Sequence, residues 1–391
     1  MEGMNHHNMN GTNKYVLLKH LALQGPLSRV DLSNKTGLSK MAVTAIVNEY
    51  IAQGVIRQCG VASSTGGRKP TLLEIDPHAL LTLGISISRD KVQVGIVNLR
   101  GEILESETVP FSSLTNSELF LNSVFYLCDL MTRHRLWERV WGIGVACAGP
   151  LSVQDGLVLN PPDFNNIHDV PIVDKLKERY GLPVYLQNDM GVAALAEMYF
   201  GTKANCNSFL YVGVGAGIGG GVIINHKLYC GASGLAGAIG HSIVEPGGLP
   251  CECGQHGCLE KYSSTRAVLK WARQESGNGQ LSWLELTSAL NNGDGLARRA
   301  FDRMSDYLIA ALTNFQMAFD LECIIIGGDL YLAQDFVVDK VRAALQSDAL
   351  AWRVRRRVRV ESSSFAGNAY FIGTAALVME NNLICNSENP Q

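Results

Sequence analysis

The sequence predicts two parts of different fold class: a small basic helical domain with a β-hairpin, then a large α/β body. The chain has 391 residues, of which 47% are apolar, enough for more than one domain with a real core. From residue 83 onward, strand-like and helix-like segments alternate, which is typical of α/β proteins. Residues 11–70 carry eight Lys or Arg and two acids, a net +6, which leaves −9 for the rest of the chain. This asymmetry indicates that only the first part meets nucleic acid.

Three short helices are expected in the first part. The first covers residues 12–23, after a polar start that is expected to be a frayed tail and that lacks the features of a signal peptide. The second follows Ser28, which forms a capping-box-like arrangement with Asp31, and ends at Gly37. The third opens at Ser39, a good N-cap. Its apolar stripe has helical spacing and consists of Val43, Ile46, Val47, Tyr50 and Ile51.

The second and third helices are joined by a tight turn around Gly37, which predicts a helix-turn-helix. Residues 55–57 and 71–75 then predict a β-hairpin with a basic tip at residues 67–70, which is a wing. Residues 1–76 therefore resemble the winged helix-turn-helix of bacterial repressors. The alternative is a small helical protein-binding module whose positive charge is incidental.

The predicted DNA contacts lie on the third helix and on the wing. A recognition helix enters the major groove by its N-terminal end, which makes Ser39, Lys40 and Thr44 candidates for contacts with base edges or phosphates. Arg68 and Lys69, at the tip of the wing, are expected to reach the backbone or the minor groove. Which of these side chains read sequence and which only position the protein stays open.

The body begins with three strand-like segments and continues with helices and further strands. We expect a helix over about residues 117–135, strands at 140–145 and 209–213, and a dense glycine loop at 213–221. The other expected strands are residues 83–87, 92–97 and 101–104. A later run, Arg353 to Arg359, is expected to be a solvated strand or helix face rather than a second DNA contact.

Several motifs in the body, taken together, point to one family. They are Leu186-Gln187-Asn188-Asp189 before a helix at 192–199, the glycines at 213–221, Gly237-Ala238-Ile239-Gly240-His241, the cysteine motif at 251–260, Gly327-Gly328, and residues 367–376. Along nearly the whole chain the sequence resembles the ROK family of repressors, open reading frames and sugar kinases. The resemblance implies an actin-like, two-lobed sugar-kinase fold for residues 77–391, with the C-terminal helix returning to the first lobe. The winged helix in front places the chain with the repressor branch.

The cysteine motif predicts a zinc site. Cys251, Cys253 and Cys258 are close in sequence and separated by glycines that permit a tight loop, and three thiolates with one imidazole complete a tetrahedral shell. The resemblance implies that His241 is the fourth ligand, and His256 is the alternative. Such a closed shell is structural, so we expect one Zn²⁺ per chain. The competing interpretation is three unrelated reduced thiols.

The resemblance also implies a sugar pocket. In the family's kinases an Asn-Asp pair contacts sugar hydroxyls, and the Asp is the general base; here these residues are Asn188 and Asp189. His241 and Glu260 match further sugar-binding positions, but Ala238 stands where the family has a Glu. The lost carboxylate leaves two interpretations, a pocket for a sugar-like inducer and a decayed pocket.

The phosphate-binding turn of the family's kinases has the approximate form Asp-x-Gly-Gly-Thr. Ser86 to Asp90 occupies that place, with Ser86 for the Asp and with Ser88 and Arg89 for the glycines. Side chains then crowd the turn, and Asp90 would repel a polyphosphate. We therefore expect no phosphoryl transfer, and no catalytic residue beyond Asp189 as a vestigial base.

Together these observations predict a cytoplasmic repressor of carbohydrate-metabolism genes that forms a homodimer or a higher homo-oligomer. It would bind double-stranded operator DNA and be released by a sugar or sugar derivative. The alternatives are a bifunctional sugar kinase and a repressor controlled by a protein partner. No apolar run is long enough to span a bilayer. Single cysteines in apolar surroundings, such as Cys128, Cys147 and Cys323, indicate reduced core thiols.

Overall fold

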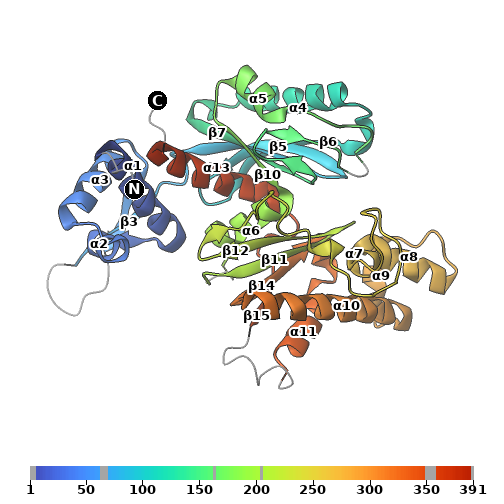
Figure 1. Cartoon of the computed structure of the whole chain (residues 1–391). Coiled ribbons are helices and arrows are strands. Elements are labelled where there is room, and N and C mark those ends of the chain that lie inside the picture. The colour runs from blue at the N-terminus through green and yellow to red at the C-terminus, as the bar shows by residue number, and fades with distance from the viewer. Residues whose placement is uncertain (1–5, 62–68, 162–163, 203–205, 348–357, 389–391) are drawn as a thin grey trace. The chain divides into compact units, whose positions relative to one another are not determined.

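The computed structural model describes residues 6–61, 69–161, 164–202, 206–347 and 358–388. The chain divides into two compact units (Figure 1). The first unit holds Met1–Asp189 together with Phe371–Gln391, and the second holds Met190–Tyr370. Among the helices of the described residues, none combines the length and the apolar character that crossing a membrane requires.

The N-terminal part of the first unit contains three helices, α1 (His6–Gln24), α2 (Arg29–Thr36) and α3 (Lys40–Ala52). The second and third begin where the sequence predicted, because local capping fixes their ends. The Ser28 hydroxyl accepts the N–H of Asp31 in a complete capping box, and Ser39 accepts the N–H of Ala42. Gly37 ends α2 in the left-handed conformation that glycine adopts without strain.

The start of α1 corrects one prediction. The helix begins at His6 rather than Thr12, so most of the polar start is helical and not a frayed tail. These residues lack the apolar periodicity on which the prediction rested. Once a helix has formed a first turn, however, it adds one hydrogen bond for each further residue, so a polar segment can extend it.

A three-stranded sheet completes the N-terminal part, with β1 (Leu27–Ser28), β2 (Ile56–Val61) and β3 (Thr71–Ile75) in the order β1-β3-β2. The hairpin β2–β3 was predicted, whereas the two-residue strand β1 was not, because only its pairing with β3 makes it a strand. Helices and sheet enclose a small core of their own, in which Leu17, Leu32, Val43, Val47 and Leu73 are fully buried.

The body of the first unit is built on a five-stranded sheet in the order β10-β7-β4-β5-β6. The strands β4, β5 and β6 form an antiparallel meander, and β7 and β10 run parallel to β4. Residues 101–102, predicted as strand, belong to the turn before β6, where the chain reverses. The elements are β4 (Leu81–Ile87), β5 (Lys91–Asn98), β6 (Ile103–Pro110), β7 (Val140–Cys147), β8 (Leu151–Ser152), β9 (Leu157–Val158), β10 (Val184–Asn188), α4 (Ser117–Thr132) and α5 (Ile172–Tyr180).

The second unit repeats this arrangement. Its sheet has the order β13-β12-β11-β14-β15, again with an antiparallel meander of three strands and two strands parallel to the first. Two sheets of identical strand order, each covered by helices, are the two-lobed fold that the sequence predicted (Figure 1). The elements are α6 (Asp189–Phe200), β11 (Phe209–Val214), β12 (Ile218–Ile224), β13 (Lys227–Leu228), α7 (Glu260–Ser263), α8 (Thr265–Ser276), α9 (Trp283–Asn291), α10 (Gly295–Phe319), β14 (Cys323–Gly328), α11 (Gln334–Leu345) and β15 (Arg359–Ser362).

The expected glycine loop is for the most part a strand, which is a second correction. Gly219, Gly220 and Gly221 lie within β12. A Cβ on Gly221 would lie 2.2 Å from the backbone oxygen of Met190, and one on Gly219 would lie 2.7 Å from the Met190 side chain. These glycines therefore allow helix α6 to approach the sheet, and their number alone is no evidence of a phosphate site.

The C-terminal helix α13 (Ala369–Glu388) returns to the first unit. It covers the face of the sheet opposite α4 and α5 (Figure 1). A Cβ on Gly84 would lie 2.3 Å from the hydroxyl of Thr374, and one on Gly144 would lie 2.4 Å from its carbonyl oxygen, so both strands need glycine where the helix crosses. Of the arginine run, residues 353–357 lie outside the described residues, and Arg359 begins β15.

Candidate functional site

Four side chains of the second unit form a cluster with the composition of a metal site: His241, Cys251, Cys253 and Cys258. Their ligand atoms all lie within 4.8 Å of one another. The Sγ atoms of Cys253 and Cys258 are 3.6 Å apart, and Nδ1 of His241 is 3.6 Å from Sγ of Cys251. A tetrahedral ion with metal–sulfur bonds of about 2.3 Å needs ligand separations of about 3.5–3.8 Å. The four residues therefore fit such an ion.

The local backbone explains why the loop has this shape. Cys251 N–H donates to the Gln255 carbonyl, and Gly254 N–H donates back to the Cys251 carbonyl, which closes a tight turn around Cys253. Gly254 and Gly257 have φ angles of +88° and +78°, a conformation in which residues with a side chain are strained. At Gly257 a Cβ would also lie only 1.8 Å from the Glu245 carbonyl oxygen.

His241, and not His256, joins the three thiols among the described residues. The 3₁₀ turn η3 (Ile239–His241) holds it, and its backbone N–H donates to the Ala238 carbonyl in the same turn. His256 is exposed and pairs through its backbone with Pro250 inside the loop. Spacing in the sequence does not distinguish the two histidines, because the position of His241 depends on where the fold places η3.

The thiols of the cluster would bind either a proton or a metal ion, and their surroundings shift their pKa values. Burial raises the pKa of the Cys251 and Cys258 thiols, while the backbone N–H of Gln255 lowers the pKa of Cys253. The Cys251 thiol donates to Oε1 of Glu260 at 3.3 Å, and that oxygen is 3.7 Å from Nδ1 of His241. Glu260, expected in a sugar pocket, therefore also lies beside the cysteine cluster.

In the first unit, Asn188 ends β10 and Asp189 begins α6. Asn188 is paired in register with Cys147 at the carboxyl end of β7, and its backbone N–H donates to Oε1 of Gln187 at 2.7 Å. Burial and, to a lesser extent, the nearby Asp189 carboxylate raise the pKa of Cys147, against the opposing charge of Arg89. The sheet thus presents an amide and a carboxylate at its carboxyl end, where ligands bind in α/β folds.

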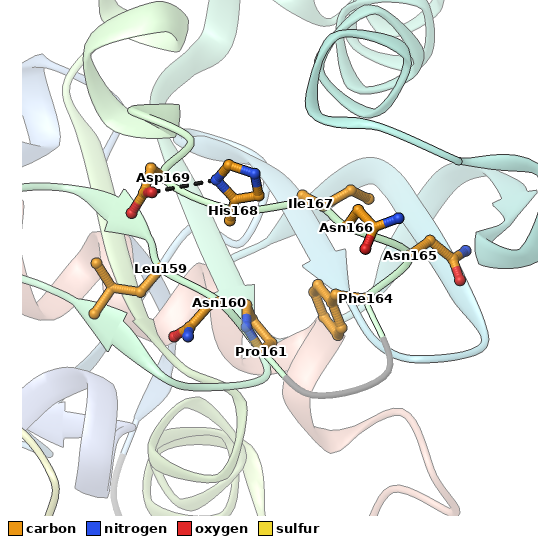
Figure 2. Close-up of a pocket in the computed structure, with 9 residues that line it drawn as sticks. All are labelled: Leu159, Asn160, Pro161, Phe164, Asn165, Asn166, Ile167, His168 and Asp169. Carbon is orange, nitrogen blue, oxygen red and sulfur yellow. Dashed lines mark hydrogen bonds and ion pairs between the residues drawn. The ribbon is translucent and has the colours of Figure 1, made fainter.

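A pocket of about 720 Å³ lies in the first unit and was not predicted from the sequence. Figure 2 shows that it combines polar side chains, such as Asn160, Asn166, His168 and Asp169, with the ring of Phe164. His168 and Asp169 form an ion pair across 3.2 Å when the imidazole is protonated. The segment is rich in Asn and Pro, which is a turn signal but says nothing of a cavity.

The backbone around this pocket is unusual. Asn165, Asn166 and Asp169 have positive φ angles of 47°, 61° and 52°, which cost free energy in residues other than glycine and tend to occur at functional sites. Side-chain hydrogen bonds hold the segment in place, since the Asn165 amide donates to the carbonyls of Phe111 and Leu114 at 3.1 and 2.9 Å.

The turn between β4 and β5 is closed by its own side chain. The Ser88 hydroxyl accepts the backbone N–H groups of Lys91 at 3.2 Å and Asp90 at 3.4 Å, and it donates to the Lys91 carbonyl at 3.1 Å. Ser86 is buried within β4. The N–H groups of Asp90 and Lys91 thus point to the serine hydroxyl, and the Ser88 N–H donates to the Lys91 carbonyl.

The N-terminal part presents an exposed face on α3. Ser39, Lys40, Met41, Thr44, Ala45 and Asn48 are exposed, whereas Val43, Ile46 and Val47 are buried. Lys69 is also exposed, and Arg68 lies outside the described residues. The structure therefore places the predicted residues of α3 on one solvent-facing surface.

The sequence pattern of the ROK family matches residues 82–381. The chain belongs to the ROK family. The match covers the bodies of both units and begins after the N-terminal helices. The fold and the family that the sequence predicted are thereby confirmed.

Within the ROK family, relatives and solved structures differ in the share of this chain that they cover. The xylose repressor of Caldicellulosiruptor bescii is 27% identical over 393 residues, 97% of this chain and 98% of the repressor. A ROK transcriptional regulator, described as a homologue of the Escherichia coli MLC protein, has a TM-score of 0.81 at 22% identity and covers 97% of this chain and 99% of its own. The ROK glucokinase of Streptomyces griseus, solved with glucose and AMPPNP, has a TM-score of 0.67 at 28% identity; the match covers 76% of this chain and 98% of the kinase.

Proposed function

We propose that this ROK protein is a DNA-binding transcriptional repressor of carbohydrate-metabolism genes, released from its operator by a sugar or sugar derivative. The proposal rests mainly on the share of the chain that each relative matches. The match to a xylose repressor spans 97% of the chain, including the N-terminal helices, whereas the match to a kinase spans 76%. A repressor of this kind works where the chromosome is, in the cytoplasm.

The N-terminal part is proposed to bind DNA as a winged helix-turn-helix. Its three helices, the β2–β3 hairpin and the net positive charge of residues 11–70 support this assignment. Ser39, Lys40 and Thr44 at the start of α3 would enter the major groove, and Arg68 and Lys69 would contact the backbone or the minor groove. Two such domains in a homodimer would match the two-fold symmetry of an operator.

The inducer is proposed to contact Asn188, Asp189, His241 and Glu260. A separate polar pocket in the first unit, lined by residues 159–161 and 164–169 and by none of these four, also has a mixture of amides, carboxylate and aromatic ring that suits a carbohydrate. Ala238 lacks the carboxylate that the family's kinases use, which removes up to two hydrogen bonds to a sugar. We therefore expect an inducer that makes fewer polar contacts at this position than a kinase substrate does.

Phosphoryl transfer is not part of the proposal. A phosphate-binding turn needs free backbone N–H groups, and the Ser88 hydroxyl already accepts those of Asp90 and Lys91. Asp90 adds negative charge at the same turn. The alternative of a bifunctional kinase predicts that purified protein phosphorylates a hexose with ATP, whereas we expect no phosphorylated sugar.

The cysteine cluster is proposed to hold one structural zinc ion per chain. Three thiolates and one imidazole leave no open position for a reacting water, so the ion would stabilise the loop between His241 and Glu260. Zinc would also fix the orientation of His241, which is proposed to bind both the metal and the inducer.

Repression and release must be coupled through the protein. An inducer can lower DNA affinity only if it binds one arrangement of the protein better than another. Within the first unit, Nζ of Lys19 on α1 lies 2.6 Å from Oε1 of Glu380 on α13, and both side chains are largely buried. This ion pair supports a mechanical link between the DNA-binding helices and the sheet that α13 covers.

Four assays with the full-length protein test the proposal. Selection from a random duplex library should yield a preferred operator, and a panel of sugars that includes D-xylose and D-glucose should yield a ligand that raises the melting temperature and weakens operator binding. If no sugar does either, a pull-down tests the alternative of a protein partner. Formation of a sugar phosphate from ATP would instead establish the kinase.

A further inference from the structure

The first two turns of α3 carry an apolar side chain that no core contact explains. Met41 is 85% exposed, more than any other large apolar residue of the described chain. The buried stripe of the helix consists of Val43, Ile46 and Val47, which are 0–5% exposed, so the fold of the domain does not need Met41. A large apolar side chain in that setting indicates a surface that meets something else.

The polar groups around Met41 are largely engaged within the domain. The Thr44 hydroxyl donates to the Lys40 carbonyl at 2.7 Å, and the Ser39 hydroxyl accepts the N–H of Ala42 at 3.2 Å. Farther along the same face, Oδ1 of Asn48 accepts from the Arg29 guanidinium at 3.0 Å. Met41 and Ala45 are therefore the apolar side chains that this otherwise polar face presents to solvent.

Helical spacing places two apolar groups on this face, because Met41 and Ala45 are four residues apart and lie one above the other. Ala45 is exposed like Met41. Met41 brings a flexible, polarisable thioether that adapts to the shape of its partner. Ala45 is small enough to let a partner approach the helix closely.

The major groove of DNA presents one apolar group on its base edges, the C5 methyl of thymine. We propose that Met41, supported by Ala45, reads thymine methyl groups in each operator half-site and is a specificity-determining residue of this protein. The inference rests on the proposed DNA binding by α3 and deepens it. It assigns part of the sequence preference to an apolar contact beside the polar residues of α3.

The test removes the methyl group from the DNA and the side chain from the protein. An operator is first selected with the full-length protein from a random duplex library, and each thymine is then replaced by uracil, which lacks only the C5 methyl. At one or two positions per half-site, binding by the parent protein should weaken about fourfold, which corresponds to about 0.8 kcal/mol for a buried methyl-sized group. In Met41→Ala, the same replacement should have almost no effect.

Two further variants serve as controls. Met41→Leu keeps an apolar side chain and should retain most of the uracil penalty. Leu284→Ala truncates another exposed apolar residue, 66% exposed on α9 of the second unit, and should behave as the parent. Circular dichroism and melting temperature verify that each variant is folded.

The outcomes separate this inference from the function on which it rests. If selection yields no preferred sequence, the DNA-binding proposal itself fails. If an operator is found and the uracil penalties are the same in the parent and in Met41→Ala, or absent from both, the role of Met41 is overturned while DNA binding stands. A uniform loss of affinity in Met41→Ala for every sequence would also overturn it, since that pattern indicates a contact that carries no sequence information.

Discussion

Two glycines of the cysteine loop provide a matched test of the metal site, through the substitutions Gly254→Ala and Gly257→Ala. Both residues have left-handed φ angles, +88° and +78°, so each substitution costs about 1–2 kcal/mol in backbone strain. At Gly254 nothing lies within 4 Å of the new Cβ, whereas at Gly257 the new Cβ would lie 1.8 Å from the Glu245 carbonyl oxygen. The additional overpacking typically costs about 1–3 kcal/mol.

The measurement is thermal unfolding together with zinc retention against a chelator. For a domain of 150–250 residues, about 1 kcal/mol shifts the melting temperature by about 2–4 °C, so Gly257→Ala should melt about 2–12 °C below Gly254→Ala. Because Cys258 directly follows Gly257, the displaced backbone should also move its thiol, and Gly257→Ala should lose zinc at a lower chelator concentration. Equal melting temperatures and equal zinc retention in the two variants would refute the close approach of Gly257 to Glu245.

Four further predictions concern the metal, the DNA and the inducer. The parent should contain about one zinc ion per chain, and Cys251→Ser should lose it, as measured by metal analysis; a folded parent without metal contradicts this. Zinc affinity in the parent should fall as pH is lowered from about 8 to about 6, because the raised pKa of the Cys251 thiol lets protons displace the metal. Lys40→Ala combined with Arg68→Ala should weaken operator binding and lower its salt dependence. In anisotropy titrations at several salt concentrations, the slope of log affinity against log salt should fall by about one unit for each phosphate that the variant no longer neutralises. Unchanged affinity would show that the interface lies elsewhere. Asp189→Ala should bind operator like the parent but need more sugar for release; an equal sugar response would remove Asp189 from the inducer site. Ala238→Glu supplies the carboxylate that the family's kinases have, and a hydrogen bond to a charged group contributes about 1.5–3 kcal/mol. Sugar binding measured by calorimetry should therefore tighten about tenfold or more. Unchanged binding would place residue 238 outside the inducer site.

The structure follows from the sequence where short-range chemistry decides it. The ends of α2 and α3 follow from Ser28, Ser39 and Gly37, whose capping roles depend only on neighbours within a few residues. The structure does not follow from local sequence where distant segments decide it. Strand β1 exists because β3 pairs with it, and Gly221 lies in a strand because β12 pairs with β11.

The candidate site divides in the same way. The spacing of the three cysteines predicts the thiol ligands, but the choice of His241 over His256 depends on η3, which only the fold brings to the loop. The pocket beside Phe164 could not be predicted, because its walls depend on positive φ angles and on hydrogen bonds from Asn165 to residues more than fifty positions away. The exposed fraction of the Met41 side chain likewise could not be predicted. Its position off the buried stripe of α3 indicates that it points away from the core of the domain, but not whether another segment covers it.

The proposed function depends on control of DNA binding by a sugar. The most direct measurement is the affinity of the zinc-loaded, full-length protein for its selected operator, titrated with each sugar of the panel in the absence of ATP. We expect one sugar to weaken operator binding by at least about tenfold, which requires only about 1.4 kcal/mol of coupling between the two sites. Operator affinity that stays constant with every sugar would contradict release by a sugar inducer and would favour control by a protein partner.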